Sequence, residues 1–134
     1  MKYAVLAGRI LFSLIFLIGG LGHFSAQSIG YAASQGVPMA SFLVPVSGVI
    51  AIIGSLSVIT GYKAKLGAWL LVIFIIPVTF SLHRFWNIPD PMMKQMDMVM
   101  FLKNIGLLGG ALFIAFFGAG PLSIDQRAES PALA

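Results

Sequence analysis

The apolar residues of this chain fall in four long blocks separated by short polar stretches. The blocks cover residues 5–22, 42–62, 66–82 and 98–117, and the third can extend to Trp86 if its helix tilts. A helix needs about 20 apolar residues to cross the hydrocarbon core of a bilayer. The blocks are continuous, unlike the alternating segments of about ten residues in a membrane β-barrel. The pattern therefore predicts an all-α integral membrane protein, a bundle of four transmembrane helices.

The stretches between the blocks have the composition of loops and turns. The first connection, residues 25–41, is polar and uncharged. The second, residues 62–65, is a tight basic turn, and the third, residues 87–97, holds two prolines that disfavour helix. We expect one membrane domain over residues 1–124, followed by a polar C-terminal tail over residues 125–134.

Composition agrees with a membrane location and excludes several classes of function. Charged residues make up 9% of the chain, too few to cover a water-facing surface. There is no cysteine, which excludes disulfides, thiolate metal sites and cysteine nucleophiles. The net charge of +4 comes from scattered Lys and Arg residues without a basic run, so membrane topology explains it better than nucleic-acid binding. No spacing of histidines and carboxylates specifies a metal site.

The positions of Lys and Arg predict the orientation in the bilayer. These residues form two groups, one at each end of the predicted bundle. One end carries Lys2, Arg9, Lys63, Lys65 and Arg127, and the other carries Arg84, Lys94 and Lys103. Because cytoplasmic segments carry the excess of positive charge, we expect a membrane protein with both termini in the cytoplasm. A cleaved signal peptide over residues 1–26 is disfavoured, because the apolar stretch is long and Arg9 interrupts it.

One face of the first predicted helix carries polar and small residues. Its members are three or four positions apart and therefore form one stripe: Arg9, Ser13, Phe16, Gly20 and His23. A stripe of this kind should face other helices and not lipid. For Arg9 itself we expect a side chain that snorkels to the cytoplasmic headgroups, because it lies near the end of the helix.

Polar residues also gather at the predicted non-cytoplasmic end of the bundle. They form a candidate polar site: His23, His83, Arg84, Trp86, Lys103 and Asn104. Histidine can exchange a proton near neutral pH, Lys and Arg can hold an anion or a quinone oxygen, and Trp can stack on a ring. Each residue taken alone also suits interfacial anchoring and packing. The pattern assigns no catalytic residue.

Small residues and one proline indicate how the predicted helices pack. Gly106 and Gly110 form a G-x-x-x-G step, which lets helices approach closely. Pro77 lies in the middle of the third predicted helix and should kink it, because it frees the carbonyl four residues back. A kink at this place either shapes a cavity or only directs the helix axis.

The last predicted helix and the turn after it resemble the DoxX family. Residues 103–110 read KNIGLLGG, and residues 117–125 read FGAGPLSID, a close variant of the G-P-G-x-x-S-x-D turn found in members of that family. Residues 8–22 and 61–65 are also similar, so the resemblance covers nearly the whole chain. One departure is Ala51, which stands where many relatives carry a glutamate, so a role that rests on this carboxylate is in doubt here.

The resemblance implies a four-helix protein of the bacterial inner (plasma) membrane that is associated with redox chemistry. Some members are subunits of a thiosulfate:quinone oxidoreductase, others accompany thiol-redox partners, and endoplasmic-reticulum cargo receptors are distant relatives. The leading hypothesis is therefore a membrane subunit in quinone or thiol redox chemistry, with a quinone as cofactor and a redox protein or a second copy as partner. The alternative is a non-enzymatic membrane assembly or cargo-binding module, followed by a small transporter.

Overall fold

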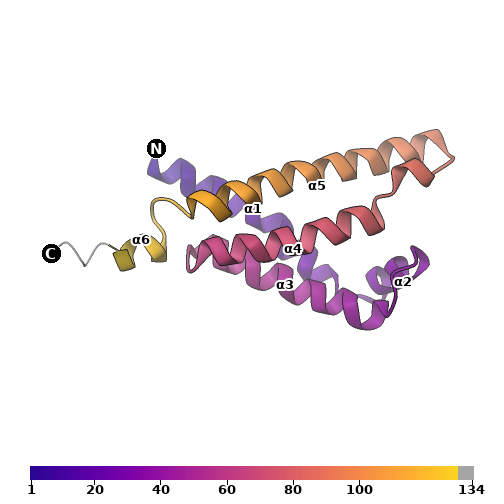
Figure 1. Ribbon diagram of the computed structural model, residues 1–134, viewed down its shortest axis with the longest axis horizontal. Coiled ribbons are helices and arrows are strands. Elements are labelled where there is room, and N and C mark those ends of the chain that lie inside the picture. Colours follow the sequence, from indigo (N-terminus) through magenta and orange to yellow (C-terminus); the bar gives the residue numbers. More distant parts are fainter. Residues whose placement is uncertain (130–134) are drawn as a thin grey trace.

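The structure, a computed structural model, describes residues 1–129, and its regular secondary structure is helical throughout this range. Four helices are long and apolar enough to cross a membrane: α1 (Lys2–Gly22), α3 (Ala40–Thr60), α4 (Ala64–Leu82) and α5 (Pro91–Phe117). Three shorter elements connect or follow them: α2 (Ala26–Ser34), the 3-10 turn η1 (Phe85–Asn87) and α6 (Ile124–Glu129) (Figure 1). The prediction of an all-α membrane protein with four transmembrane helices is confirmed.

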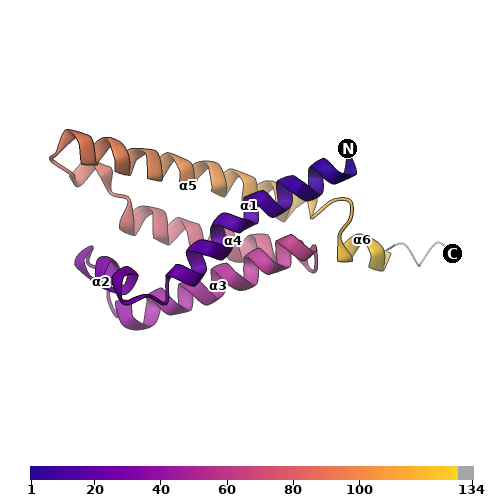
Figure 2. The same ribbon diagram turned by 180° about the vertical axis from the view of Figure 1, so that it is seen from behind.

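The four long helices pack in a defined order. α3 packs against both α1 and α4, and α5 packs on α4 (Figure 2). α2 rests on α3 at one end of the bundle, whereas the N-terminus and α6 lie at the opposite end. The first connection is thus more than a loop. Ser25 caps α2 by accepting a hydrogen bond of 3.1 Å from the N–H of Ser28, which satisfies a donor that the first helical turn leaves free.

Glycines set the closest approaches between the helices. A Cβ atom added to Gly48 of α3 would lie 2.7 Å from the carbonyl oxygen of Gly20 in α1. A Cβ added to Gly54 would lie 2.9 Å from the carbonyl oxygen of Gly67 in α4. Because no side chain fits at these points, the backbones of α1, α3 and α4 are in direct contact, which is how membrane helices gain packing energy without a hydrophobic effect between them.

The residues predicted to control helix packing lie in three different surroundings. A Cβ on Gly110 would lie 2.8 Å from the ring of Phe12, so this glycine makes room for α1. Gly106 has no atom within 4 Å of the corresponding position, so α5 presents it to open space. Pro77 lies inside α4, which continues past it to Leu82, and it borders a cavity between α2, α3 and α4.

The polar stripe of α1 faces the interior of the bundle. The buried residues of this helix are Arg9, Ser13, Phe16 and Gly20, which confirms that part of the predicted stripe. The expectation that Arg9 snorkels to the headgroups is wrong, because its side chain is only 4% exposed. Its guanidinium donates to the carbonyl oxygens of Ala119 at 2.8 Å and Leu122 at 2.9 Å. Arg9 therefore binds the segment that follows α5, supplying donors to carbonyls left without helical partners.

The segment after α5 is also attached to the turn between α3 and α4. The carboxylate of Asp125 accepts hydrogen bonds from the N–H groups of Lys63 at 2.7 Å and Ala64 at 3.0 Å. It therefore caps the start of α4 from a distant part of the sequence. Residues 130–134 of the predicted polar tail lie outside the described residues, and the domain boundary predicted at residue 124 stays a prediction.

Candidate binding groove

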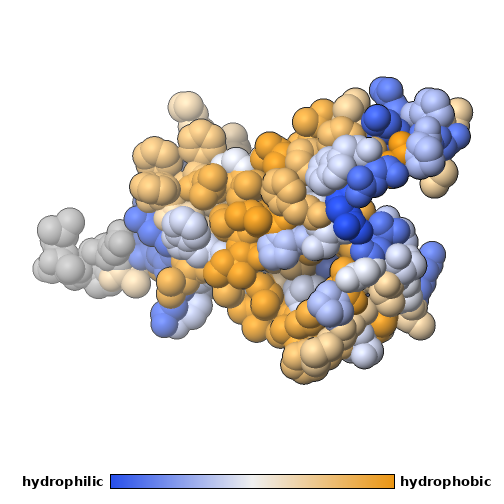
Figure 3. Space-filling model, turned by 45° about the vertical axis from the view of Figure 1, so that its right-hand side comes forward, coloured by the Kyte–Doolittle hydropathy of each residue, from blue (hydrophilic) through white to orange (hydrophobic). Residues whose placement is uncertain are grey.

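A cavity of about 900 Å³ lies between α2, α3 and α4, at the end of the bundle that carries α2. We call this cavity the groove. Apolar side chains form most of its wall, among them Val44 and Ile50 of α3 and Phe74 of α4. It opens to the surface, because Val46 and Phe80 in its wall are 38% and 51% exposed. In Figure 3 the hydrophilic side chains gather toward the ends of the molecule, and the surface is hollowed between the lobe of α2 and the start of α5.

The polar part of the groove consists of hydroxyl, amide, imidazole and guanidinium groups. The side chains that bear them come from α2 and from the neighbouring parts of α1, α3 and α4: His23, Gln27, Ser28, Tyr31, Gln35, Ser47, Ser81 and Arg84. No acidic side chain of the described residues lines the groove. Its lining therefore offers many hydrogen-bond partners and no negative charge.

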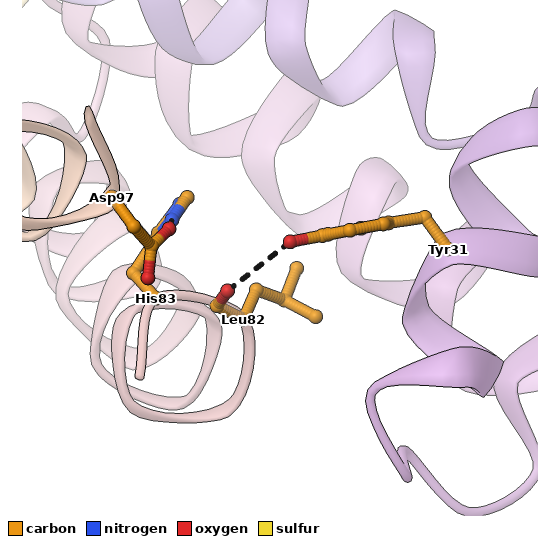
Figure 4. Close-up of polar contacts among 4 residues, drawn as sticks. All are labelled: Tyr31, Leu82, His83 and Asp97. Carbon is orange, nitrogen blue, oxygen red and sulfur yellow. Dashed lines mark hydrogen bonds and ion pairs between the residues drawn. The ribbon is translucent and has the colours of Figure 1, made fainter. Parts of the chain in front are cut away.

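Two hydrogen bonds fasten α2 to the end of α4. The Nη2 atom of Arg84 donates to the carbonyl oxygen of Gln35, the C-cap residue of α2, at 2.6 Å. The hydroxyl of Tyr31 donates to the carbonyl oxygen of Leu82 at 3.4 Å (Figure 4). The second bond is long, and the first is short and charge-assisted, so Arg84 is the stronger tether. The Nε atom of Arg84 is buried and has no hydrogen-bond partner among the described residues.

His23 closes the groove at the end of α1. Its Nδ1 atom lies 2.8 Å from the hydroxyl oxygen of Ser47, and that hydroxyl donates its proton to the carbonyl oxygen of Val44 at 2.7 Å. Because the Ser47 proton is already used, the imidazole donates from Nδ1 in this arrangement. Burial lowers the pKa of His23, which favours the neutral ring. Among the described residues, Arg84 is consequently the single charged group in the groove wall.

The structure divides the predicted polar site. His23 and Arg84 line the groove. His83 lies outside it, where its Nδ1 atom is 2.9 Å from a carboxylate oxygen of Asp97 and joins α4 to α5 (Figure 4). Trp86 packs edge-on against the ring of Phe101, with 5.9 Å between the ring centroids.

The last two residues of the predicted site lie farther along α5. Lys103 is exposed, Asn104 is 5% exposed, and neither borders the groove. The structure thus brings two of the six predicted residues to one cavity, and functional roles for the six stay predictions.

Sequence reasoning missed the contribution of α2, whose Tyr31 and Gln35 line the groove and bind α4. A local signal was present. Ser25 is a favourable N-cap residue, and Ile29 and Ala32 follow at helical spacing on the face that packs against α3.

Comparison with known proteins identifies the family. The chain matches the sequence model of the SURF4 family over residues 1–130. The chain belongs to the SURF4 family. It is similar to two inner membrane proteins of Escherichia coli strain K12. It is 26% identical to YphA over 125 residues and 29% identical to YqjF over 124 residues, which cover 92% and 91% of this chain and 89% of each relative.

Longer relatives occur in yeasts. The chain is 25% identical over 126 residues to a Surfeit locus protein 4 homolog of Schizosaccharomyces pombe. It is 28% identical over 128 residues to the ER-derived vesicles protein ERV29 of Saccharomyces cerevisiae. These matches cover 93% of this SURF4-family chain in both cases, but only 37% and 34% of the two relatives. No solved structure matches the chain.

Membership of the SURF4 family corrects two predictions. The assignment to the DoxX family is wrong, because the family model that matches nearly the whole chain is that of SURF4. The redox hypothesis that depended on this assignment is also wrong, since the matching family is that of Surfeit locus protein 4 and ERV29, and none of the relatives named here points to redox chemistry. The turn that suggested the resemblance has a structural explanation in this fold. Its carbonyls bind Arg9, and Asp125 caps α4.

Proposed function

We propose that this SURF4-family protein is a non-enzymatic binding module of the bacterial inner membrane, which holds an apolar segment of a protein cargo in the groove. The observation that carries the proposal is the groove itself, with its largely apolar wall and its scattered hydroxyl and amide groups. An extended peptide needs both features, because its side chains require apolar contacts and its backbone requires hydrogen-bond partners. The name of the yeast relative, an ER-derived vesicles protein, is consistent with a function in handling other proteins.

The histidine and serine in the groove wall are not arranged for catalysis. A nucleophilic serine must give its proton to the base beside it. The hydroxyl of Ser47 instead donates to the carbonyl oxygen of Val44, and the Nδ1 atom of His23 acts as a donor. This geometry favours a binding role for the pair, in which both groups hold the groove wall in place.

The distribution of charge supports a groove on the non-cytoplasmic face. Lys63 and Lys65 lie at the start of α4, at the end of the bundle that carries α6, and α2 lies at the other end. If the basic end faces the cytoplasm, both termini are cytoplasmic and the groove opens toward the opposite side of the membrane. The inner membrane proteins of Escherichia coli to which the chain is similar support the same membrane.

The proposal can be tested by filling the groove. Val46 lines it and can be replaced by tryptophan, whereas Phe113 is 69% exposed on α5 outside the groove and provides a matched control, Phe113→Trp. Each variant is purified in mild detergent from its native membrane, and the copurifying proteins are quantified by mass spectrometry. We expect a stoichiometric partner with the wild type and with Phe113→Trp that is lost with Val46→Trp. A set of copurifying proteins that is the same for all three would contradict the proposal.

A further inference from the structure

The charge of the groove is unbalanced. Of the residues that the structure describes, Arg84 alone brings a charge to the wall, and none of those in the wall is acidic. Asp97 does not balance the charge of Arg84, because it pairs with His83 and forms no ion pair with Arg84. The neutral form of His23 adds no second cation. The groove therefore presents one positive charge without a counter-charge to whatever enters it.

The guanidinium of Arg84 is held in place but not saturated with acceptors. Its Nη2 atom is fixed by the carbonyl oxygen of Gln35 at 2.6 Å, and this carbonyl lies at the C-terminus of α2, where the helix dipole attracts a cation. Its Nε atom is buried and has no acceptor among the described residues, and its Nη1 atom donates no hydrogen bond to any of them. The guanidinium can therefore take a further acceptor through Nη1, and a carboxylate is the acceptor that best matches its planar geometry.

We infer that the groove selects cargo segments that carry an acidic side chain among apolar ones, and that the carboxylate pairs with Arg84. The inference deepens the proposed function and rests on it. The open form of the groove favours a side-chain carboxylate, because a chain that crosses an open groove can continue on both sides and need not end there. An acyl chain cannot form hydrogen bonds with the hydroxyl and amide groups of the wall, whereas a peptide backbone can.

The test uses two peptide probes that differ in one group. Both are fluorescent octapeptides of leucine and valine, acetylated and amidated at their ends, with either glutamate or glutamine in the centre. Their binding to the purified full-length protein in detergent micelles is measured by fluorescence anisotropy. We expect the glutamate peptide to bind at least about tenfold more tightly than the glutamine peptide, because its hydrogen bond with Arg84 is assisted by charge on both sides.

Variants of Arg84 show whether the preference comes from this residue. Arg84→Gln should remove the difference between the two peptides, and Arg84→Glu should prefer a third peptide with a central lysine. Because Arg84 also tethers α2, Tyr31→Phe serves as the matched control. It removes the other tether, the bond of 3.4 Å to Leu82. Because Tyr31 also lines the groove, the variant should weaken the binding of both peptides by the same factor and keep the ratio of their affinities.

The outcomes separate the inference from the proposed function. Equal affinity of the wild type for both peptides, with saturable binding that is lost in Val46→Trp, would overturn the carboxylate inference and leave the groove as a peptide site. A preference that survives in Arg84→Gln would overturn it as well. Absence of saturable binding for every peptide would contradict the proposed function itself.

Discussion

Replacement of Gly48 by alanine should force α1 and α3 apart. The new Cβ atom would lie 2.7 Å from the carbonyl oxygen of Gly20 and 2.8 Å from the Cβ atom of His23. Ordinary contacts of a Cβ atom begin near 3.4 Å, so the two helices must separate by about 0.7 Å at this level. A change of rotamer cannot relieve the clash, because neither neighbouring atom moves with a side-chain torsion.

The cost follows from the rigidity of the contact. Overpacking of a close-packed site lowers stability by about 1–3 kcal/mol. The higher helix propensity of alanine than of glycine offsets at most about 1 kcal/mol of this loss. We therefore expect Gly48→Ala to lower the free energy of unfolding by about 1–2 kcal/mol. The shift also reaches the groove, because Ser47 is the neighbour of Gly48 and its hydroxyl lies 2.8 Å from His23.

Gly19 provides the matched control on α1. A Cβ atom at this position has no neighbour within 4 Å, so Gly19→Ala should leave stability unchanged or raise it slightly. Both variants can be compared by reversible unfolding in mixed micelles, followed by circular dichroism. If Gly48→Ala proves as stable as Gly19→Ala, α1 and α3 do not meet as closely as the structure shows, and the reasoning fails.

Three further changes probe the remaining contacts. Arg9→Met removes the donors to the carbonyls that follow α5 and should lower the free energy of unfolding by about 2–3 kcal/mol. A protease should then cut this segment faster in limited proteolysis. Unchanged resistance to the protease would contradict the prediction. Asp125→Ala uncaps α4 and should lower the unfolding free energy by about 1 kcal/mol in the same micelle assay. Burial lowers the pKa of His23, so the unfolded chain binds its proton more readily. Stability should therefore fall as the pH drops from 7.5 toward the folded-state pKa, and unfolding titrations should show a flatter pH dependence for His23→Gln.

The four transmembrane helices were predictable because the bilayer restricts the secondary structure that a polypeptide can adopt. Every backbone polar group within the bilayer must be satisfied inside its own segment, so an apolar block of sufficient length specifies a helix. The helix α2 was missed because it is short, uncharged and outside the apolar blocks. Its stability depends on packing against α3 and on tethers from α4, which are contacts between distant parts of the chain.

The candidate site was only partly predictable, for a geometric reason. His83 and Arg84 were predicted to end the third helix, but α4 ends at Leu82 and both residues follow it. Neighbouring residues at such a position can point to different sides. Here His83 bonds with Asp97 of α5, and Arg84 bonds with α2. The role of Arg9 was hidden for a related reason, since the carbonyls that it binds belong to residues 110 or more positions later in the sequence.

The most direct test of the account is to identify what occupies the groove in the native membrane. A photo-crosslinking amino acid is placed at Val46, inside the groove, and at Phe113, on the exposed face of α5. After irradiation of whole membranes, crosslinked peptides are mapped by mass spectrometry. The account predicts that Val46 captures one extended, apolar segment of another protein that Phe113 does not reach. Adducts at Val46 that contain only lipid, or the same neighbours as at Phe113, would contradict it.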